Sequence, residues 1–277
     1  MKTLKIKKKY FRRACCLLLV LLLGMGGCGN RKRSPVPDDD FGKDEFVPVM
    51  ADPGTGKTDK NNSGKKRVAL TLDDGPHNVY TKKIVDELSK YGYHATFFVV
   101  GNRVNGPEYN GASAMLYAYE KGNEIAIHGF THAKYYDTCS AEEFAAELSK
   151  TRQAIKATIP SANVRLMRPV GGRITGERVQ RCEYSVIMWD VDSEDWKYKT
   201  KTSDDEAAKK EKIDTIVENV MSSVRDGSVI LMHDIYESTY ESVAIILKEL
   251  HEQGYEVVTV SELFGNDLKA GAKYSRK

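Results

Sequence analysis

Apolar and polar residues change their spacing at residue 67, and from there to residue 264 two patterns alternate. Short runs rich in Val, Ile, Leu and Phe predict buried strands, and longer stretches with apolar residues three and four positions apart predict helices that cover them. The expected strands are 67–72, 95–100, 124–127, 165–168, 185–190, 228–232 and 255–260. The expected helices are 79–91, 112–121, 141–158, 174–181, 208–226 and 238–253.

The alternation of strand and helix predicts an α/β domain with a parallel sheet of about seven strands. Such a sheet can be open and doubly wound or can form a distorted (β/α) barrel, and the length of the segment does not choose between the two. No internal repeat is visible. Helix 141–158 has the clearest boundary signals, because Ser140 and Glu143 form a capping-box pattern and Pro160 follows its end.

Residues 1–28 have the layout of a signal peptide for export. A basic stretch ends at Arg13, an apolar run spans residues 14–23, and small residues lead to Cys28. The run is too short for a membrane-spanning helix, which needs about 20 apolar residues. The residues before Cys28 resemble a bacterial lipobox, although Met25 stands where that pattern prefers Leu. We expect lipidation at Cys28, with an uncleaved anchor as the alternative, and an exported protein of a bacterium held outside the cytoplasm at the membrane.

Residues 29–66 are expected to form a disordered linker, since their few apolar residues show no period. Residues 51–58 satisfy a relaxed phosphate-binding loop pattern, but no strand pattern precedes them and no helix pattern follows, so no nucleotide is expected. Seven of the 42 Lys and Arg lie in residues 1–27, and the other 35 stand against 39 Asp and Glu. This balance gives no reason to expect nucleic-acid binding.

Two of the five cysteines, Cys139 and Cys182, lie outside the export segment. One pair does not make a disulfide framework, and the sequence leaves open whether the two are bridged. Residues 265–277 form a C-terminal tail, of which residues 266–277 are expected to fray because they contain few apolar side chains.

Charged and imidazole side chains follow the ends of the expected strands. Sites in parallel α/β folds form at the C-terminal ends of the strands, so these residues are expected at one rim. Each group alone has an ordinary explanation as a turn or a solvated loop, but their joint placement favours a functional site. The segments are Asp73-Asp74-Gly75-Pro76, His128-Gly129-Phe130-Thr131-His132, Arg168-Pro169, Asp190–Trp196 and His233-Asp234.

These residue types suit a hydrolytic metal centre. An Asp and two His are ligands for Zn²⁺ or a similar divalent cation, and three protein ligands leave one position open for water. A second carboxylate can accept a proton from water, an Arg can keep that carboxylate ionised, and a His can protonate a leaving group. Together they predict hydrolysis of an acyl bond.

Residues 67–264 resemble the NodB-homology polysaccharide deacetylases, carbohydrate esterase family four. Five motifs of the family, TFDDGP, H-[ST]-x-x-H, RPPYG, D-x-x-D-W and L-x-H, have counterparts in the same order. The counterparts are Thr71–Pro76, His128 with His132, Arg168-Pro169, Asp192–Trp196 and Leu231–His233. The resemblance implies the distorted (β/α) barrel of that family, with fewer than eight regular strands.

The resemblance also implies a metal site at Asp74, His128 and His132. The expected ion is Zn²⁺, with Co²⁺ or a similar divalent cation as the alternative.

Four further residues receive catalytic roles from the same resemblance. Asp73 would be the general base that activates water, and His233 would be the general acid for the leaving group. Arg168 would position Asp73, and Asp192 would orient the Arg168/His233 side of the site.

The resemblance assigns the substrate pocket to three positions and exposes two departures. The backbone N–H of Gly171 would help to hold the oxyanion, and Trp196 with Leu231 would enclose the acetyl methyl group. Gly129 stands where the family has Ser or Thr, which predicts a looser histidine loop. Val170-Gly171 stands where the family has Pro-Tyr, so a ring that flanks the substrate is missing. Tyr135 and Tyr136, after the second motif, are candidates for stacking on a sugar.

The function implied by the resemblance and the export segment is removal of N-acetyl groups from N-acetylglucosamine units of an envelope polysaccharide, with peptidoglycan as the expected substrate. Two alternatives remain open. The same residues could act on O-acetyl esters of a polysaccharide such as xylan, or the chain could be a catalytically weak relative that binds glycan. No nucleic acid or nucleotide is expected as a partner.

Overall fold

The computed structural model describes residues 64–106 and 111–277 of the chain, which belong to one unit spanning Asp59–Lys277. The expectations about the export segment, lipidation at Cys28 and nearly all of the 29–66 linker lie outside the described residues. Within the described part of the chain, no helix combines the length and the apolar character needed to cross a membrane.

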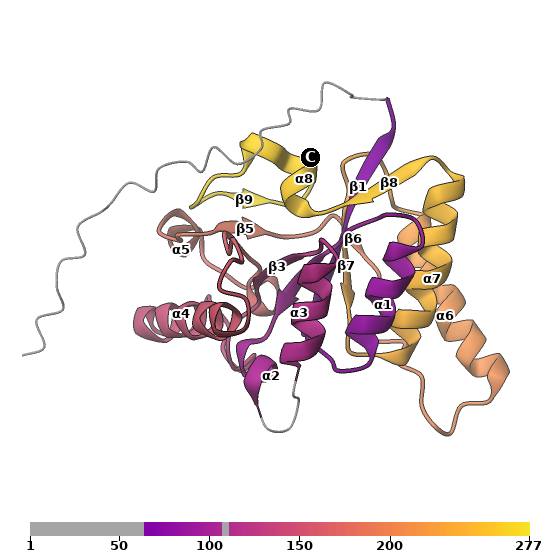
Figure 1. Cartoon of the computed structure of the whole chain (residues 1–277), viewed down its shortest axis with the longest axis horizontal. Helices are drawn as coiled ribbons and strands as arrows, with labels where there is room; N and C mark the ends of the chain where they lie inside the picture. The colour runs from indigo at the N-terminus through magenta and orange to yellow at the C-terminus, as the bar shows by residue number, and fades with distance from the viewer. Residues whose placement is uncertain (1–63, 107–110) are drawn as a thin grey trace, which may run out of the picture. The chain divides into compact units, whose positions relative to one another are not determined.

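A parallel sheet forms the centre of the described part (Figure 1). All strand pairs in the sheet run parallel, in the order β6-β7-β1-β2-β3-β4-β5-β9, and β8 pairs with the first half of β1. The strands are β1 (Lys66–Asp73), β2 (Thr96–Val99), β3 (Glu124–Ile127), β4 (Leu166–Met167), β5 (Ser185–Ile187), β6 (Val191–Asp192), β7 (Val229–His233), β8 (Tyr255–Val258) and β9 (Lys273–Tyr274). The described strands include no pairing between β6 and β9, so the barrel is open.

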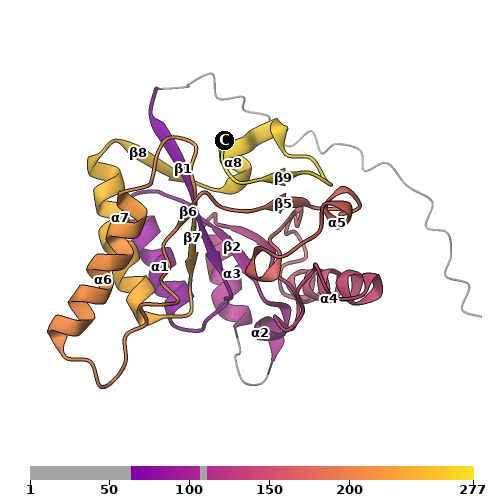
Figure 2. The same ribbon diagram turned by 180° about the vertical axis from the view of Figure 1, so that it is seen from behind.

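The helices α1, α3, α4, α5, α6 and α7 add buried residues to one apolar cluster on the outer face of the sheet, whereas α8 packs in the cluster on the opposite face (Figures 1 and 2). Helices α1, α6 and α7 lie at the β7 side of the sheet, and α4 and α5 lie near β5. The helices are α1 (Tyr80–Ser89), α2 (Gly101–Asn105), α3 (Ala112–Glu120), α4 (Ala141–Thr158), α5 (Gly176–Gln180), α6 (Glu206–Met221), α7 (Glu237–Glu252) and α8 (Val260–Phe264), with short 3-10 turns at Val170–Gly172 and Gly265–Asp267.

All expected strands and helices are present, which confirms the α/β barrel-like fold class. The elements that the sequence did not predict, β6, β9, α2 and α8, have two to five residues each. Segments of that length show no readable period. Helix α4 has the expected capping box: the Ser140 hydroxyl accepts from the Glu143 N–H, and the Glu143 carboxylate accepts from the Ser140 N–H.

Alternation along β1 directs side chains to the two faces of the sheet. Val68, Leu70 and Leu72 belong to the apolar cluster under the helices, whereas Ala69 belongs to a smaller cluster with residues of β2, β3 and α8. Because successive residues of a strand point to opposite faces, Asp73 shares the face of Ala69. Asp73 ends β1, and its carboxylate is therefore directed into the barrel at the C-terminal rim.

The expectation that residues 266–277 fray is wrong. Strand β9 pairs in parallel with β5, and the Lys277 N–H donates to the Gly227 carbonyl at 2.9 Å. Tyr274, the one aromatic residue of the tail, is half-buried and packs edge-on against Phe264 in α8. The question about the two remaining cysteines is also answered, since Cys139 and Cys182 are both free.

Candidate active site and metal centre

The turn after β1 presents two adjacent carboxylates in a constrained backbone. Asp74 has a φ of 74°, in the left-handed region that L-residues rarely adopt, and the Arg103 guanidinium donates to its carbonyl at 2.6 Å. Gly75 follows, and a Cβ there would lie 2.3 Å from an oxygen of Asp234. The turn therefore requires glycine at position 75. The turn is held by the hydrogen bond from Arg103 and packs closely against Asp234.

The structure brings the three predicted metal ligands together. His128 directly follows β3, and His132 lies four residues later on the same loop. One ligand atom from each of Asp74, His128 and His132 lies within 4.8 Å of the others. The His132 Nε2 atom is 2.9 Å from Asp74 Oδ1, and the His128 Nε2 atom is 3.5 Å from the same oxygen.

The hydrogen bonds and charges of this cluster fit a divalent cation. The Nδ1 atom of His128 is 3.0 Å from the Arg168 carbonyl, so it carries the ring proton and the Nε2 lone pair faces Asp74. Burial lowers the pKa of His128 despite Asp73 and Asp74 nearby, which keeps the imidazole neutral. Burial raises the pKa of Asp74, but the contacts with His132 and His128 outweigh it and hold that pKa well below the usual range.

The surroundings of Asp74 test whether a divalent cation fits this site. Its buried Oδ1 atom has no hydrogen-bond partner among the described residues, although two imidazole nitrogens face it. One carboxylate oxygen and two imidazole nitrogens are the ligand set that Zn²⁺ and similar ions accept in sites with an open position. The residues present therefore fit a divalent cation.

Glu147 of α4 holds the histidine loop, and sequence reasoning missed it. One carboxylate oxygen accepts from the Phe130 N–H at 2.7 Å and the Thr131 N–H at 2.9 Å, and the other accepts from the Thr131 hydroxyl at 2.8 Å. A Cβ at Gly129, where φ is 102°, would lie 2.5 Å from the Tyr136 hydroxyl. The expectation of a looser loop at Gly129 is therefore wrong: this loop is fixed by Glu147 and leaves no room for Ser or Thr.

Arg168 lies under Asp73 with no exposed surface. Its guanidinium donates to Asp73 Oδ1 and to the Thr71 hydroxyl, both at 2.8 Å, and also to the carbonyls of Ile187 and Met188. Burial lowers the pKa of Arg168, and the Asp73 carboxylate opposes this. Asp73 thus has the fixed cationic partner that the sequence predicted, and its second oxygen lies 3.6 Å from His128 Nε2.

His233, at the end of β7, is held by Asp195 and not by Asp192. The buried Asp195 accepts from His233 Nδ1 at 2.7 Å with one oxygen, and with the other from the His233 N–H at 2.8 Å and the Thr239 hydroxyl at 2.5 Å. Burial lowers the pKa of His233, but the bond to Asp195 and its charge outweigh this and raise the pKa to about 9. The imidazole is therefore protonated at neutral pH.

The prediction for Asp192 needs correction on this point. Its carboxylate accepts from the Glu194 N–H at 2.9 Å within its own loop. Its charge does support Arg168, which is one half of the predicted role. Both acids belong to the D-x-x-D-W pattern, and spacing alone did not reveal that the second one is buried against β7.

Asp234 was expected at this rim from the sequence, but it received no role there. It is fully buried beside Gly75 and accepts from the Thr81 hydroxyl, which in turn accepts from the His77 N–H at 2.8 Å. Burial raises its pKa to about 7. The only sequence signal was its position after His233.

Of the three predicted substrate-pocket residues, Leu231 lies within β7, and Gly171 and Trp196 lie in the loops four residues after β4 and β6. Gly171 follows β4 with a φ of 59° and is exposed, so its N–H is on an accessible turn. Leu231 is buried in β7, and Trp196 is 48% exposed after β6. The placement agrees with a rim location for all three, while their roles stay predictions.

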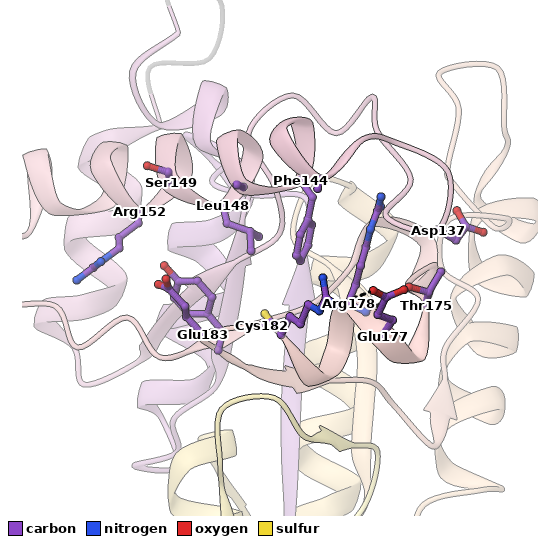
Figure 3. A pocket seen from close by; sticks show the side chains of 14 residues that line it. Asp137, Phe144, Leu148, Ser149, Arg152, Thr175, Glu177, Arg178, Cys182 and Glu183 are labelled. Carbon is purple, nitrogen blue, oxygen red and sulfur yellow. Dashed lines mark hydrogen bonds and ion pairs between the residues drawn. The ribbon is translucent and has the colours of Figure 1, made fainter. Parts of the chain in front are cut away.

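A cavity of about 600 Å³ lies between α4 and the segment around α5 (Figure 3). Phe144 and Leu148 project into it from α4, opposite Arg178 and Cys182. None of the predicted site residues lines it. The cavity is therefore separate from the Asp-His-His cluster.

Comparison with characterised proteins places these features in a family. The polysaccharide deacetylase family model matches residues 60–185. The peptidoglycan-N-acetylmuramic acid deacetylase PdaC of Bacillus subtilis is 36% identical over 200 residues, 72% of this chain and 39% of that protein. The peptidoglycan-N-acetylglucosamine deacetylase PgdA of Listeria monocytogenes is 31% identical over 215 residues, 76% of this chain and 42% of that protein. The chain thus spans about two fifths of the length of both relatives.

Solved structures give the same result. A T48 deacetylase with substrate matches with a TM-score of 0.67 and 32% identity, covering 77% of this chain and 98% of that chain. A family 4 acetyl xylan esterase from Clostridium thermocellum, in complex with cobalt, matches with a TM-score of 0.65 and 28% identity, covering 76% and 98%. The chain belongs to the polysaccharide deacetylases of carbohydrate esterase family four.

Proposed function

We propose that this protein is a Zn²⁺-dependent hydrolase that removes N-acetyl groups from N-acetylglucosamine units of peptidoglycan. The observation that carries the proposal is the convergence of Asp74, His128 and His132, with Asp73 at 3.6 Å from His128. The names of PdaC and PgdA support peptidoglycan as the substrate. An exported lipoprotein, anchored through Cys28, would be located where that polymer lies.

The proton transfers follow from the contacts of two residue pairs. Asp73 accepts a proton from the attacking water, and the Arg168 guanidinium at 2.8 Å keeps this carboxylate ionised and directed into the site. A bound divalent cation would polarise the acetyl carbonyl and lower the pKa of water. His233 enters the reaction protonated and donates its proton to the departing amine, while Asp195 fixes the ring and stabilises its charge.

The acyl group would be held by the remaining predicted residues. The N–H of Gly171 donates to the oxyanion, in the role of a preorganised main-chain donor. Trp196 and Leu231 enclose the acetyl methyl group. An amine is a poor leaving group unless it is protonated, so the raised pKa of His233 suits an amide better than an ester.

The direct test is acetate release by the full-length protein from peptidoglycan, chito-oligosaccharides and acetylated xylan, with added Zn²⁺ and with chelator. We expect release from the N-acetylated glycans that chelator abolishes. Asp73→Asn should lower kcat by roughly 10³-fold or more. Asp214→Asn is the matched control, since this residue is exposed on α6 and pairs with Lys210 at the surface. Equal acetate release by Asp73→Asn and the wild type would exclude this mechanism.

A second function, hydrolysis of O-acetyl esters, is favoured by the match to an acetyl xylan esterase. An alkoxide leaves more readily than an unprotonated amine, so an esterase depends less on a general acid. We expect His233→Ala to remove activity on N-acetyl substrates and to spare much of any activity on acetylated xylan. A higher kcat/KM on acetylated xylan than on every N-acetylated glycan would assign the esterase function instead.

The third reading, a weak glycan-binding relative, was motivated by the departures at Gly129 and Val170-Gly171. Glu147 accepts three hydrogen bonds from the histidine loop and fixes it, so Gly129 no longer favours this reading. Only the departure at Val170-Gly171 still does. Bound metal without turnover on any glycan would support this reading.

A further inference from the structure

Two aromatic side chains stand out among the exposed apolar residues of the described chain. Tyr135 is 46% exposed and Trp196 is 48% exposed, and the other large exposed apolar residues are aliphatic. Both rings belong to loops that follow strands at the C-terminal rim, Tyr135 after β3 and Trp196 after β6. Trp196 has a predicted place in the acetyl pocket, whereas the sequence made Tyr135 only a candidate for stacking on a sugar, with no subsite.

The Tyr135 ring lies against Gly171. A Cβ built on Gly171 would be 3.3 Å from Cε1 and 3.8 Å from Cδ1 of this ring. The ring therefore fills the space beside Gly171, the position where the resemblance places a tyrosine in other family members. A tyrosine at position 171 itself would also have to adopt a φ of 59°, which strains any residue with a Cβ.

Contacts on the neighbouring loop hold the Tyr135 ring in place. The Arg173 guanidinium carbon lies 4.2 Å from the ring centroid, and Arg173 donates to Asp137 at 2.9 Å. The Tyr136 N–H donates to the Arg173 carbonyl at 3.1 Å, which ties the loop after β3 to the loop after β4. Because Arg173 covers one face and almost half of Tyr135 remains exposed, the ring offers a supported apolar surface to solvent.

We propose that Tyr135 is a specificity-determining residue that stacks on the sugar next to the one being deacetylated. This inference rests on the proposed function. Aromatic faces bind the C–H surface of a pyranose ring, and the ring's contact with Gly171 places it beside the predicted oxyanion donor. Tyr135 thus restores, from a different loop, the ring that Val170-Gly171 lacks. The ligand class is a β-linked oligomer of N-acetylhexosamines and not a single sugar.

The test compares two substrates in the full-length protein. In Tyr135→Ala we expect KM for a tetramer of N-acetylglucosamine to rise roughly five- to tenfold, with kcat changed by less than about twofold. Hydrolysis of 4-nitrophenyl acetate, which has no sugar, should be unchanged. Tyr135→Phe should behave as wild type, because the stacking needs only the ring. Tyr119→Ala is the control, since this partly exposed tyrosine lies where α3 leads into β3, at the other end of the strands.

Equilibrium binding of the same tetramer in chelator separates this inference from the proposed function. Binding that weakens in Tyr135→Ala supports the stacking role even if no acetate is released. An unchanged affinity and an unchanged KM for the tetramer in Tyr135→Ala overturn the stacking role and leave the deacetylase function intact. A parallel loss of 4-nitrophenyl acetate hydrolysis would also overturn it, because Tyr135 would then act on the loop structure and not on the sugar.

Discussion

Arg168 is a buried cation that supplies the counter-charge for the Asp73 carboxylate. It has no exposed surface, its guanidinium carbon lies 4.3 Å from the Phe98 ring, and its donors are directed at Asp73, Thr71 and two carbonyls. A buried cation of this kind is tolerated only with its partners in place. Its removal would leave the Asp73 carboxylate buried without a counter-charge.

We therefore predict that Arg168→Met lowers the free energy of unfolding by about 3–5 kcal/mol. Urea denaturation of the metal-free protein measures this, with Arg181→Met as the control. Arg181 is 79% exposed and pairs with Glu177 on the surface, so its loss should cost less than about 1 kcal/mol. Equal stability of the two variants would show that the buried pair contributes nothing.

The pair of His233 and Asp195 predicts a change in pH dependence. Asp195 raises the pKa of His233, so the proton required for the leaving group persists above neutral pH and is lost as the pH rises through about 9. In Asp195→Asn the charge that raises this pKa is absent, so the alkaline limb of the kcat profile moves to lower pH. At pH 8 we expect kcat to fall roughly tenfold or more.

Asp192→Asn is the informative control for this shift. Its carboxylate accepts from the Glu194 N–H, and no hydrogen bond or ion pair joins it to His233 within the described residues. The alkaline limb should therefore keep its position in this variant, measured at the same metal occupancy as the wild type. If the alkaline limb of the kcat profile shifted in Asp192→Asn and not in Asp195→Asn, Asp192 and not Asp195 would be the residue that raises the pKa of His233.

At the scale of elements, the histidine loop depends on α4, the helix that follows it in the chain. Glu147 lies on α4, 15 positions after His132, and its three hydrogen bonds fix the segment between the two histidines. Residues that orient metal ligands from behind typically change metal affinity by a factor of about 10–100. The loop is thus rigid because of long-range contacts and not because of its own residues.

Glu147→Gln should raise the dissociation constant for Zn²⁺ roughly 10- to 100-fold, since an amide cannot accept all three hydrogen bonds. Competition with a chromophoric chelator measures this without any substrate. Glu142→Gln, on the exposed face of the same helix, should bind Zn²⁺ as the wild type does. An affinity that Glu147→Gln leaves unchanged would mean that the loop is held by other contacts.

The family's own residue should be harmful at position 129. Gly129→Ser places a Cβ 2.5 Å from the Tyr136 hydroxyl at a φ of 102°, so we expect a loss of about 1–3 kcal/mol in unfolding free energy. Tyr136→Phe alone should be close to neutral, because this hydroxyl has no hydrogen-bond partner within the described residues. The double variant should recover part of the loss. Thermal unfolding of the three variants tests this, and a stable Gly129→Ser protein would contradict it.

The long elements could be predicted from sequence because their periods extend over enough residues to be read. Strand alternation fixed the direction of Asp73, and the position of His128 after β3 fixed the rim. Glu147 and Asp195 could not be identified in this way, since their partners lie 16 to 44 positions away in the sequence. The pairing of the C-terminal tail with β5 was also missed, because a strand of two residues, such as β9, shows no readable period.

At the scale of the whole molecule, the open barrel gathers one residue group from each of several strands at a single rim. Asp73 ends β1, His128 follows β3, Arg168 follows β4 and His233 ends β7. Of these four strands only β3 and β4 follow one another in the chain, and the sheet order β7-β1-β2-β3-β4 brings all four together. The parallel sheet is what brings residues spread over the sequence together into a candidate cation site.

The central claim is that Asp74, His128 and His132 hold one cation on which acetate release depends. The most direct measurement is a titration of the metal-free, full-length protein with Zn²⁺, following bound metal and acetate release from peptidoglycan together. We predict that bound metal and acetate release rise in proportion and level off at one ion per chain. The His128→Ala variant should neither bind the ion nor release acetate. Acetate release at full rate before any metal is bound, or in His128→Ala, would contradict the account.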